Sequence, residues 1–132
     1  MADISVKILD MNLKNPVMPA AGPTVKDAQA AHEAKEGGAG AIVTKTISVE
    51  AAEVPRPNMA QAKSGFLNSE LWSELPPEQW LKEEYPEVVK TDLPIIVGLG
   101  YSADEIKKLA QEVEPYADAL ELSTHYLGED PT

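Results

Sequence analysis

Ala41-Ile42-Val43-Thr44-Lys45-Thr46 is the segment of this chain that says most about its architecture. It is rich in β-branched residues and uncharged until Lys45, which is typical of a strand buried on both faces of a sheet. Short apolar segments of the same kind occur upstream at residues 16–20 and downstream at residues 94–99 and 119–123. We expect these four segments to form parallel strands that lie side by side in sequence order.

Helical patterns separate the four predicted strands. The first pattern covers residues 24–36, with Thr24 as its predicted N-cap. The second begins at Pro76-Pro77, and we expect Pro86 to end or kink it. The third follows the strand at residues 94–99 and begins with a capping box, so every strand but the last is followed by a helix.

The order of these elements predicts an α/β fold. Residues 4–15 alternate between apolar and polar and predict a short β-hairpin, whereas residues 48–72 show no period and predict a long loop. Residues 16–123 then read as βα units ending in a strand, which corresponds to the N-terminal half of a (β/α)8 TIM barrel. Four strands cannot close such a barrel, so we expect residues 1–132 to be one partial domain, either a fragment or a split barrel. A small open doubly wound sheet is the structural alternative.

The composition disfavours several classes of function. The formal net charge is −11, from 22 acidic and 11 basic residues, which argues against binding to nucleic acid or to an anionic membrane. The chain contains no cysteine and therefore no disulfide, thiolate metal site or cysteine nucleophile, and we predict no metal site. The first residues lack the regions of a signal peptide and no apolar run could span a bilayer, so we expect a cytoplasmic protein.

The alternation of side chains along the strands brings two charged residues into consideration. Lys45 lies at the carboxyl end of its strand, the end at which barrel enzymes have their active sites. Glu121 and Ser123 share one face of the last strand, opposite Leu120 and Leu122. We expect Lys45 to pair with Glu121 or with a ligand that both contact, because a buried charge needs a partner. An ion pair with no chemical role is the alternative.

Three motifs in order resemble one family. Residues 15–22 read NPVMPAAG, which is similar to the N-P-x-x-x-A-[SA]-G run on the first strand of class 1 dihydroorotate dehydrogenases. Thr44-Lys45-Thr46 resembles their second-strand T-K-[ST] motif, and GFLNS at residues 65–69 resembles the G-x-x-N-S of their substrate loop. The resemblance covers nearly the whole chain and implies a TIM barrel that binds flavin mononucleotide, FMN.

The resemblance also implies roles for individual residues. The cofactor-binding set that it implies is Ala20, Ala21, Gly22, Lys45, Thr46 and Glu121. Lys45 would contact the flavin ring and the substrate and stabilise negative charge on the reduced flavin. Glu121 stands where the family has an asparagine that contacts the flavin. The substrate-binding residues that it implies are Asn68 and Ser69.

The chain departs from the family at the position of the catalytic base. The family has Cys or Ser there, and this chain has Thr124, which is followed by a histidine that could act as a base near neutral pH. The catalytic candidates are Lys45, Thr124, His125 and Tyr126. After Asn68-Ser69 the family continues M-G-L-P-N, whereas this chain has acidic side chains at Glu70 and Glu74. Together with Glu121 these would oppose orotate, which is an anion.

The sequence therefore predicts a dihydroorotate dehydrogenase-like, FMN-dependent oxidoreductase that acts on a C–C or C–N double bond of a small molecule other than dihydroorotate. One alternative is a non-catalytic half-barrel subunit that binds a partner chain. Another is a flavin-free barrel enzyme with Lys45 as a Schiff-base nucleophile. We expect an oligomer, and a second half of the barrel from the same longer chain or a partner subunit. That half would have to cover apolar sheet residues such as Val43 and Val97.

Overall fold

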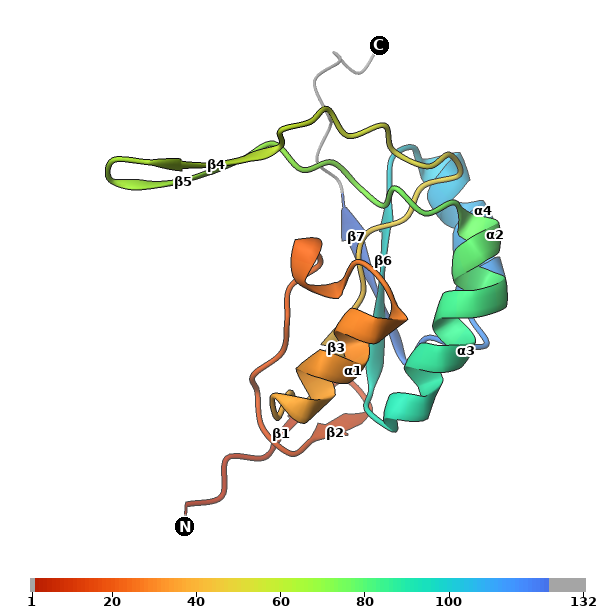
Figure 1. Ribbon diagram of the computed structural model, residues 1–132. Coiled ribbons are helices and arrows are strands. Elements are labelled where there is room, and N and C mark those ends of the chain that lie inside the picture. Colours follow the sequence, from red (N-terminus) through yellow and green to blue (C-terminus); the bar gives the residue numbers. More distant parts are fainter. Residues whose placement is uncertain (1, 124–132) are drawn as a thin grey trace.

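A three-stranded parallel sheet forms the centre of the computed structural model, which describes residues 2–123 (Figure 1). Its strands are β3 (Ile42–Val43), β6 (Ile95–Gly100) and β7 (Ala119–Ser123), and they lie in that order. Both pairs of neighbouring strands are parallel. The predicted α/β class is confirmed, and so is the parallel order of these three strands.

Helices cover one face of this sheet (Figure 1). They are α1 (Ala28–Glu36), a continuous run of α2 (Pro77–Gln79), η2 (Trp80–Glu84), α3 (Tyr85–Val88) and η3 (Val89–Thr91), and finally α4 (Ala103–Val113). Buried helical side chains such as Trp80 and Leu109 form one apolar cluster with Val97 and Leu99 of β6. Among the residues that the structure describes, no helix is long and apolar enough to cross a membrane.

An antiparallel strand pair lies against the other face of the sheet. It consists of β1 (Val6–Ile8) and β2 (Met11–Leu13). Met11 and Leu13 are buried with Ala41, and Ile96 and Ala119 pack against this small cluster. Because Ile96 lies beside Ala119 in the register of β6 and β7, the pair covers the amino-terminal end of both strands.

Val43 and Val97 are buried within this chain, with 4% and 0% of their surface exposed. The expectation that a second half-barrel must cover them is wrong. Val97 lies in the helical cluster, and β3 has β6 on one side and the segment around Val17 on the other. The exposed apolar side chains of the sheet are instead those of Leu120 and Leu122, on β7.

Residues 16–20 form no strand, which corrects the prediction of a fourth strand. Pro16 and Pro19 have no N–H group to donate to a ladder. The segment is nevertheless held beside the start of β3, because the backbone N–H of Gly40 donates to the carbonyl of Val17 at 2.8 Å. The loop that follows it reaches the carboxyl end of β3, where the backbone N–H of Lys45 donates to the carbonyl of Val25 at 3.0 Å.

The N-cap of the first helix also differs from the prediction. Thr24 lies in the short 3-10 turn η1 (Pro23–Val25), and α1 begins only after Asp27. The Asp27 carboxylate accepts a hydrogen bond from the backbone of Ala30 at 2.8 Å. Asp27 thus satisfies one of the free N–H groups of the first helical turn.

The second helix does not end at Pro86, so the first of the two predicted outcomes is wrong, but its hydrogen-bond pattern is irregular just before the proline. The turn η2 is π-helical, and the backbone N–H of Tyr85 donates to the carbonyl of Trp80, one residue further back than in an α-helix. The next segment, α3, then starts afresh with Pro86 in its first turn, where a missing N–H costs little. The helical run continues to Thr91.

A second hairpin lies within residues 48–72, which were predicted to be loop. It consists of β4 (Met59–Ala62) and β5 (Gly65–Asn68), paired antiparallel. All of its residues are exposed, and it projects away from the body of the molecule (Figure 1). Because neither face is buried, its sequence has no apolar alternation that would have revealed it.

Candidate active site at the carboxyl ends of the strands

Lys45 lies two residues after the end of β3, at the point where the backbone leaves the regular ladder. The N–H of Thr44 still donates to Ile96 of β6 at 3.0 Å, but that of Lys45 donates to Val25 of η1 at 3.0 Å. The Lys45 residue is only 5% exposed. Its position thus combines a strand end, burial and a formal positive charge.

Glu70 is the partner of this lysine. The Nζ of Lys45 donates to the Oε2 of Glu70 at 2.6 Å, and the two side chains are 7% and 13% exposed. The Oε1 of Glu70 accepts a short hydrogen bond from the Nδ2 of Asn58, which is itself buried. The guanidinium of Arg56 lies 3.9 Å from the same oxygen and also pairs with Glu74 at 2.5 Å.

The Lys45–Glu70 pair fixes the positions of both side chains in the site. Each charge compensates the other in a place largely closed to water, so removal of either partner costs about 3–5 kcal/mol in typical buried pairs. Asn58 fixes the second carboxylate oxygen, so Glu70 has little freedom to turn away. The ammonium group of Lys45 is therefore held at one place.

The predicted pairing of Lys45 with Glu121 is wrong. Glu121 is exposed and forms no ion pair within the described residues, whereas Lys45 is bound by Glu70. Parity along the strand did give the right face, because Glu121 lies opposite Gly98 in the register and shares a side with Ala119. The loop containing Glu70 reaches Lys45 first, and the periodicity of the strands carries no information about that loop.

A cavity of about 380 Å³ opens beside the ion pair. Its charged lining consists of three bases and three acids, so the formal charge of the wall is balanced. These residues are Lys26, Lys45, Arg56, Asp27, Glu70 and Glu74. Pro23, Met59 and Leu75 supply apolar surface. The arrangement suits a small ligand that combines polar groups with an uncharged body.

The predicted cofactor-binding residues at the end of the first segment lie near this cavity. Ala20 is exposed and Ala21 and Gly22 are half-buried. A Cβ atom added to Gly22 would meet nothing nearer than the carbonyl of Ala20 at 3.8 Å, so there is free space on that side of the backbone. Pro23, the next residue, lines the cavity together with Lys45. The structure thus brings this segment and Lys45 together.

Thr46 lies over β6. It is 5% exposed, and its Oγ1 would be 3.0 Å from a Cβ atom at Gly98. Its backbone carbonyl accepts from Ser73 at 2.8 Å, which ties the loop after the hairpin to the strand end. A cofactor role for the Thr46 hydroxyl stays a prediction.

The predicted substrate residues serve the local structure of the loop. The Oδ1 of Asn68 accepts from the backbone of Glu70 at 2.8 Å, and the N–H of Ser69 donates to the carbonyl of Asn58 at 2.8 Å. Both bonds hold Glu70 in its orientation toward Lys45. Contact with a substrate by Asn68 or Ser69 is not tested by these bonds and stays a prediction.

Sequence reasoning did not find Glu70 as the partner of Lys45, nor Asn58 and Arg56 as neighbours of the Glu70 carboxylate. The available signal was the acid at position 70, where the resembling family has methionine. A buried lysine at a strand end requires a counter-charge, and Glu70 directly follows the predicted substrate loop. The remaining catalytic candidates, Thr124, His125 and Tyr126, lie outside the described residues.

Thr44, the residue before Lys45, links the end of β3 to β6 and to Tyr85 of the helical layer. Thr44 is fully buried, and its Oγ1 accepts from the backbone of Gly98 at 3.4 Å. Burial raises the pKa of the Tyr85 phenol well above its usual value, an effect that the Thr44 hydroxyl partly offsets. Tyr85 is therefore neutral at physiological pH, and within the described part of the chain its hydroxyl has no well-formed hydrogen bond.

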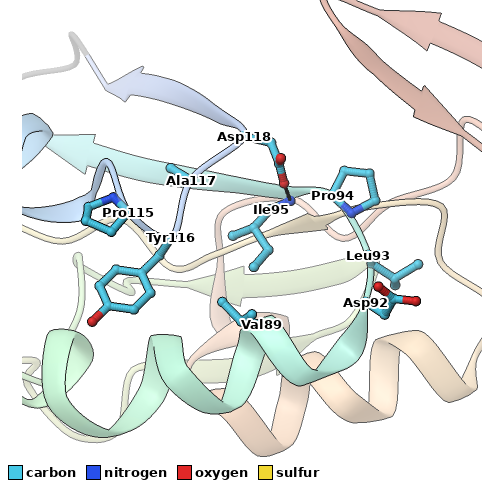
Figure 2. Close-up of a pocket in the computed structure, with 9 residues that line it drawn as sticks. All are labelled: Val89, Asp92, Leu93, Pro94, Ile95, Pro115, Tyr116, Ala117 and Asp118. Atoms are coloured by element: carbon cyan, nitrogen blue, oxygen red, sulfur yellow. Dashed lines mark hydrogen bonds between the residues drawn. The ribbon is translucent and has the colours of Figure 1, made fainter.

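Two further cavities do not combine the features of the site at Lys45. One, of about 440 Å³, includes Trp72 and Tyr101, whose rings meet edge to face 5.5 Å apart. The other, of about 410 Å³, lies at the amino ends of β6 and β7 (Figure 2). There the carboxylate of Asp118 accepts from the backbone of Ile95 at 2.8 Å, which is a structural bond. Residues 2–123 contain no cluster of side chains that could hold a metal ion.

A parallel α/β sheet with buried polar groups at the carboxyl ends of its strands defines a class of ligand-binding proteins. Comparison with known sequences narrows this class. A sequence model of the family described as "Dihydroorotate dehydrogenase" matches residues 3–124. Because the match covers most of the chain, this protein belongs to the dihydroorotate dehydrogenase family.

Several curated relatives match over nearly the whole chain. The catalytic subunit of dihydroorotate dehydrogenase B (NAD(+)) from Methanothermobacter thermautotrophicus is 32% identical over 122 residues, covering 91% of this chain and 40% of the relative. The corresponding subunit from Pyrococcus horikoshii is 31% identical over 125 residues, with the same coverage. Dihydroorotate dehydrogenase A (fumarate) from Lactiplantibacillus plantarum is 32% identical over 137 residues, covering 93% of this chain and 42% of the relative. The chain thus spans about two fifths of the length of these relatives.

Proposed function

We propose that this chain is the N-terminal half of a TIM-barrel oxidoreductase that binds FMN and acts on a C–C or C–N double bond of a small molecule. The observation that carries the proposal is the buried Lys45 at the carboxyl end of β3, in a chain that belongs to the dihydroorotate dehydrogenase family. The rest of the barrel comes from a longer chain or from a partner subunit. A cytoplasmic location and an oligomeric state remain predictions of the sequence.

The residues present fit the ring portion of FMN. Lys45 offers a fixed ammonium group, Thr46 a hydroxyl, and the segment from Ala20 to Gly22 a backbone with free space beside Gly22. These are donors and acceptors suited to the polar edge of a flavin. The phosphate of the cofactor is expected on loops of the second half, as in other barrels of this type.

In this proposal, FMN supplies two-electron chemistry at its ring when bound. Lys45 places a positive charge where negative charge develops, which lowers the energy of the transition state more than that of the ground state. Glu70 and Asn58 fix the direction of the Lys45 side chain. One of Thr124, His125 and Tyr126 exchanges the substrate proton.

The substrate in this proposal is not dihydroorotate. The chain has Thr124 where the family has its catalytic base, and acidic side chains at Glu70 and Glu74 beside the site. Orotate carries a carboxylate, and although the charge of the wall is balanced, its one buried cation, Lys45, is already paired with Glu70, whose carboxylate opposes a second anion at that place.

The test is the Lys45→Ala variant of the complete protein. Flavin reduction, followed by stopped-flow absorbance, should slow by roughly tenfold or more while flavin affinity changes little. Lys107→Ala on the exposed side of α4 removes the same charge elsewhere and should leave the rate unaltered. Reduction at the normal rate in a folded, flavin-loaded Lys45→Ala variant would remove Lys45 from the mechanism.

A second candidate function is a non-catalytic half-barrel subunit that binds a partner chain. The exposed Leu120 and Leu122 on β7 favour it, because they offer an apolar surface for another chain. Flavin absorbance of the purified complete protein separates the two functions. A colourless protein that takes up no added FMN supports the subunit, and a yellow one supports the oxidoreductase.

A further inference from the structure

Glu70 neutralises the cation that defines the proposed active site. Its carboxylate lies 2.6 Å from the ammonium of Lys45, and both side chains are almost completely buried. Two separate contacts, from Asn58 and from the backbone of Glu70 to Asn68, hold it there. The pairing is therefore built into the loop and is not a chance encounter of two flexible side chains.

The balance of charge around the cavity follows from this pair. Arg56 is paired with Glu74 at 2.5 Å, and the carboxylate of Asp27 caps α1. The number of basic side chains on the wall does not exceed the number of acidic ones. Lys26 is the cation of the wall that forms no ion pair within the described residues, but it is exposed, so solvent screens its charge. An anionic substrate would have to bring its charge beside the buried Glu70, and like charges in a partly buried site oppose binding strongly.

An uncharged ring suits the same groups. Lys45 has donors left beyond the one that Glu70 accepts, and these can bind a carbonyl oxygen. An ionised carboxylate only accepts, so Glu70 can receive an N–H of the ring. The neighbouring pair of a C=O and an N–H is the pattern of a cyclic amide.

We propose that Glu70 determines substrate specificity and that it selects a cyclic amide without a carboxylate. This inference rests on the proposed function, and it adds the class of substrate and the residue that selects it. The carbonyl oxygen of the ring accepts from Lys45 and its N–H donates to Glu70. Substrates with a carboxylate are rejected because the charge of Lys45 is already neutralised by its ion pair with Glu70.

The experiment compares uracil with orotate, which is the same ring bearing a carboxylate. Binding of each is measured by calorimetry on the complete protein, and flavin content is read separately from absorbance. Unmodified protein should bind uracil at least roughly tenfold more tightly than orotate. Glu70→Met, which introduces the residue of the resembling family, and Glu70→Gln should both raise orotate affinity by roughly tenfold or more.

Glu74→Gln is the matched control. It removes one negative charge from the same wall, but from a side chain that is 44% exposed and pairs with Arg56 instead of Lys45. Its effect on the ratio of uracil to orotate affinity should stay within about threefold, because both the lost charge of Glu74 and the released charge of Arg56 are exposed and screened by solvent. An equal effect of Glu74→Gln would show that overall charge, and not Glu70, sets the preference, and would overturn the assignment.

The possible outcomes separate the inference from the proposed function. A flavin-loaded protein that binds orotate as tightly as uracil overturns the inference and leaves the oxidoreductase standing. A preference for uracil that persists in folded Glu70→Met and Glu70→Gln proteins overturns the role of Glu70. A protein without flavin overturns the proposed function. If neither variant folds, the ratio in the unmodified protein still decides whether the substrate class is right.

Discussion

Tyr85 carries a polar atom that the fold leaves without a good partner. Its ring packs 5.0 Å from that of Trp80 and 5.5 Å from that of Tyr116, but among the described residues its hydroxyl forms no well-made hydrogen bond. Tyr85→Phe should therefore leave the free energy of unfolding unchanged or raise it by up to about 1 kcal/mol. Tyr116→Phe is the control, because the Tyr116 hydroxyl donates to the carbonyl of Leu81 at 3.1 Å. It should lower the free energy of unfolding by about 1 kcal/mol in urea denaturation at pH 7.

The same residue gives a prediction about alkaline pH. Burial raises the pKa of the Tyr85 phenol in the folded protein above the unfolded value of 10.0. The unfolded chain then loses its proton first, so the contribution of Tyr85 to stability is complete below pH 10 and declines as the pH rises further. Melting temperatures of the unmodified protein should fall more steeply above this pH than those of Tyr85→Phe. Parallel curves would mean that the phenol ionises normally.

The site shows which residues could be read from sequence and which could not. Lys45 was found because a charged residue interrupts an apolar strand, and Glu121 was placed on the correct face by alternation. The partnership of Lys45 with Glu70 spans 25 positions through a loop without any period. Such a contact depends on the path of the loop in space, which local patterns do not encode.

The elements show the same division. Strand β7 and helix α4 agree with the sequence closely, because an apolar run and a capping box mark them. The hairpin of β4 and β5 was missed because it buries neither face. The continuation of the second helix beyond Pro86 was not foreseen, because it depends on a π-helical turn just before the proline. Elements that depend on burial were predictable, and those that depend on an unusual backbone bond or on exposed pairing were not.

Gly40 lies just before β3 and holds the segment at residues 16–20 beside that strand through its bond to Val17. A substitution at Gly40 tests how this segment is held. A Cβ atom on Gly40 would lie 2.0 Å from the backbone oxygen of Asn15, and backbone cannot yield as a flexible side chain can. Gly40→Ala should lower the free energy of unfolding by at least about 2 kcal/mol. It should also weaken FMN binding, because the displaced segment carries Ala20 and Ala21. Gly65→Ala, where no atom lies within 4 Å, should change stability by less than about 0.5 kcal/mol. Equal losses in the two variants, measured by denaturation, would contradict the close approach at Gly40.

For the molecule as a whole, both faces of the sheet have cover, but its edge at β7 is open. Its helical face is covered by α1, the run from α2 to η3, and α4, whereas β7 has β6 as its partner and leaves Leu120 and Leu122 at 41% and 52% exposure. An edge strand has unpaired backbone groups that can pair with a further strand, and exposed apolar side chains on it favour burial by that neighbour. In the proposed barrel, the next βα unit covers this edge.

Labelling of an introduced thiol measures that cover directly, since this chain contains no cysteine of its own. Leu122→Cys in the complete protein should react with a maleimide roughly tenfold or more slowly than Gln111→Cys on the exposed surface of α4, because a covered thiol reacts only when the structure opens. Mass spectrometry of peptides assigns the label to each position. The edge explanation predicts that the difference disappears when residues 1–132 are studied alone, since Leu122 is then exposed as in the present structure. Fast labelling of Leu122→Cys in the complete protein would show that β7 remains an edge there, and the completed barrel would have to be abandoned even if the ion pair at Lys45 stands.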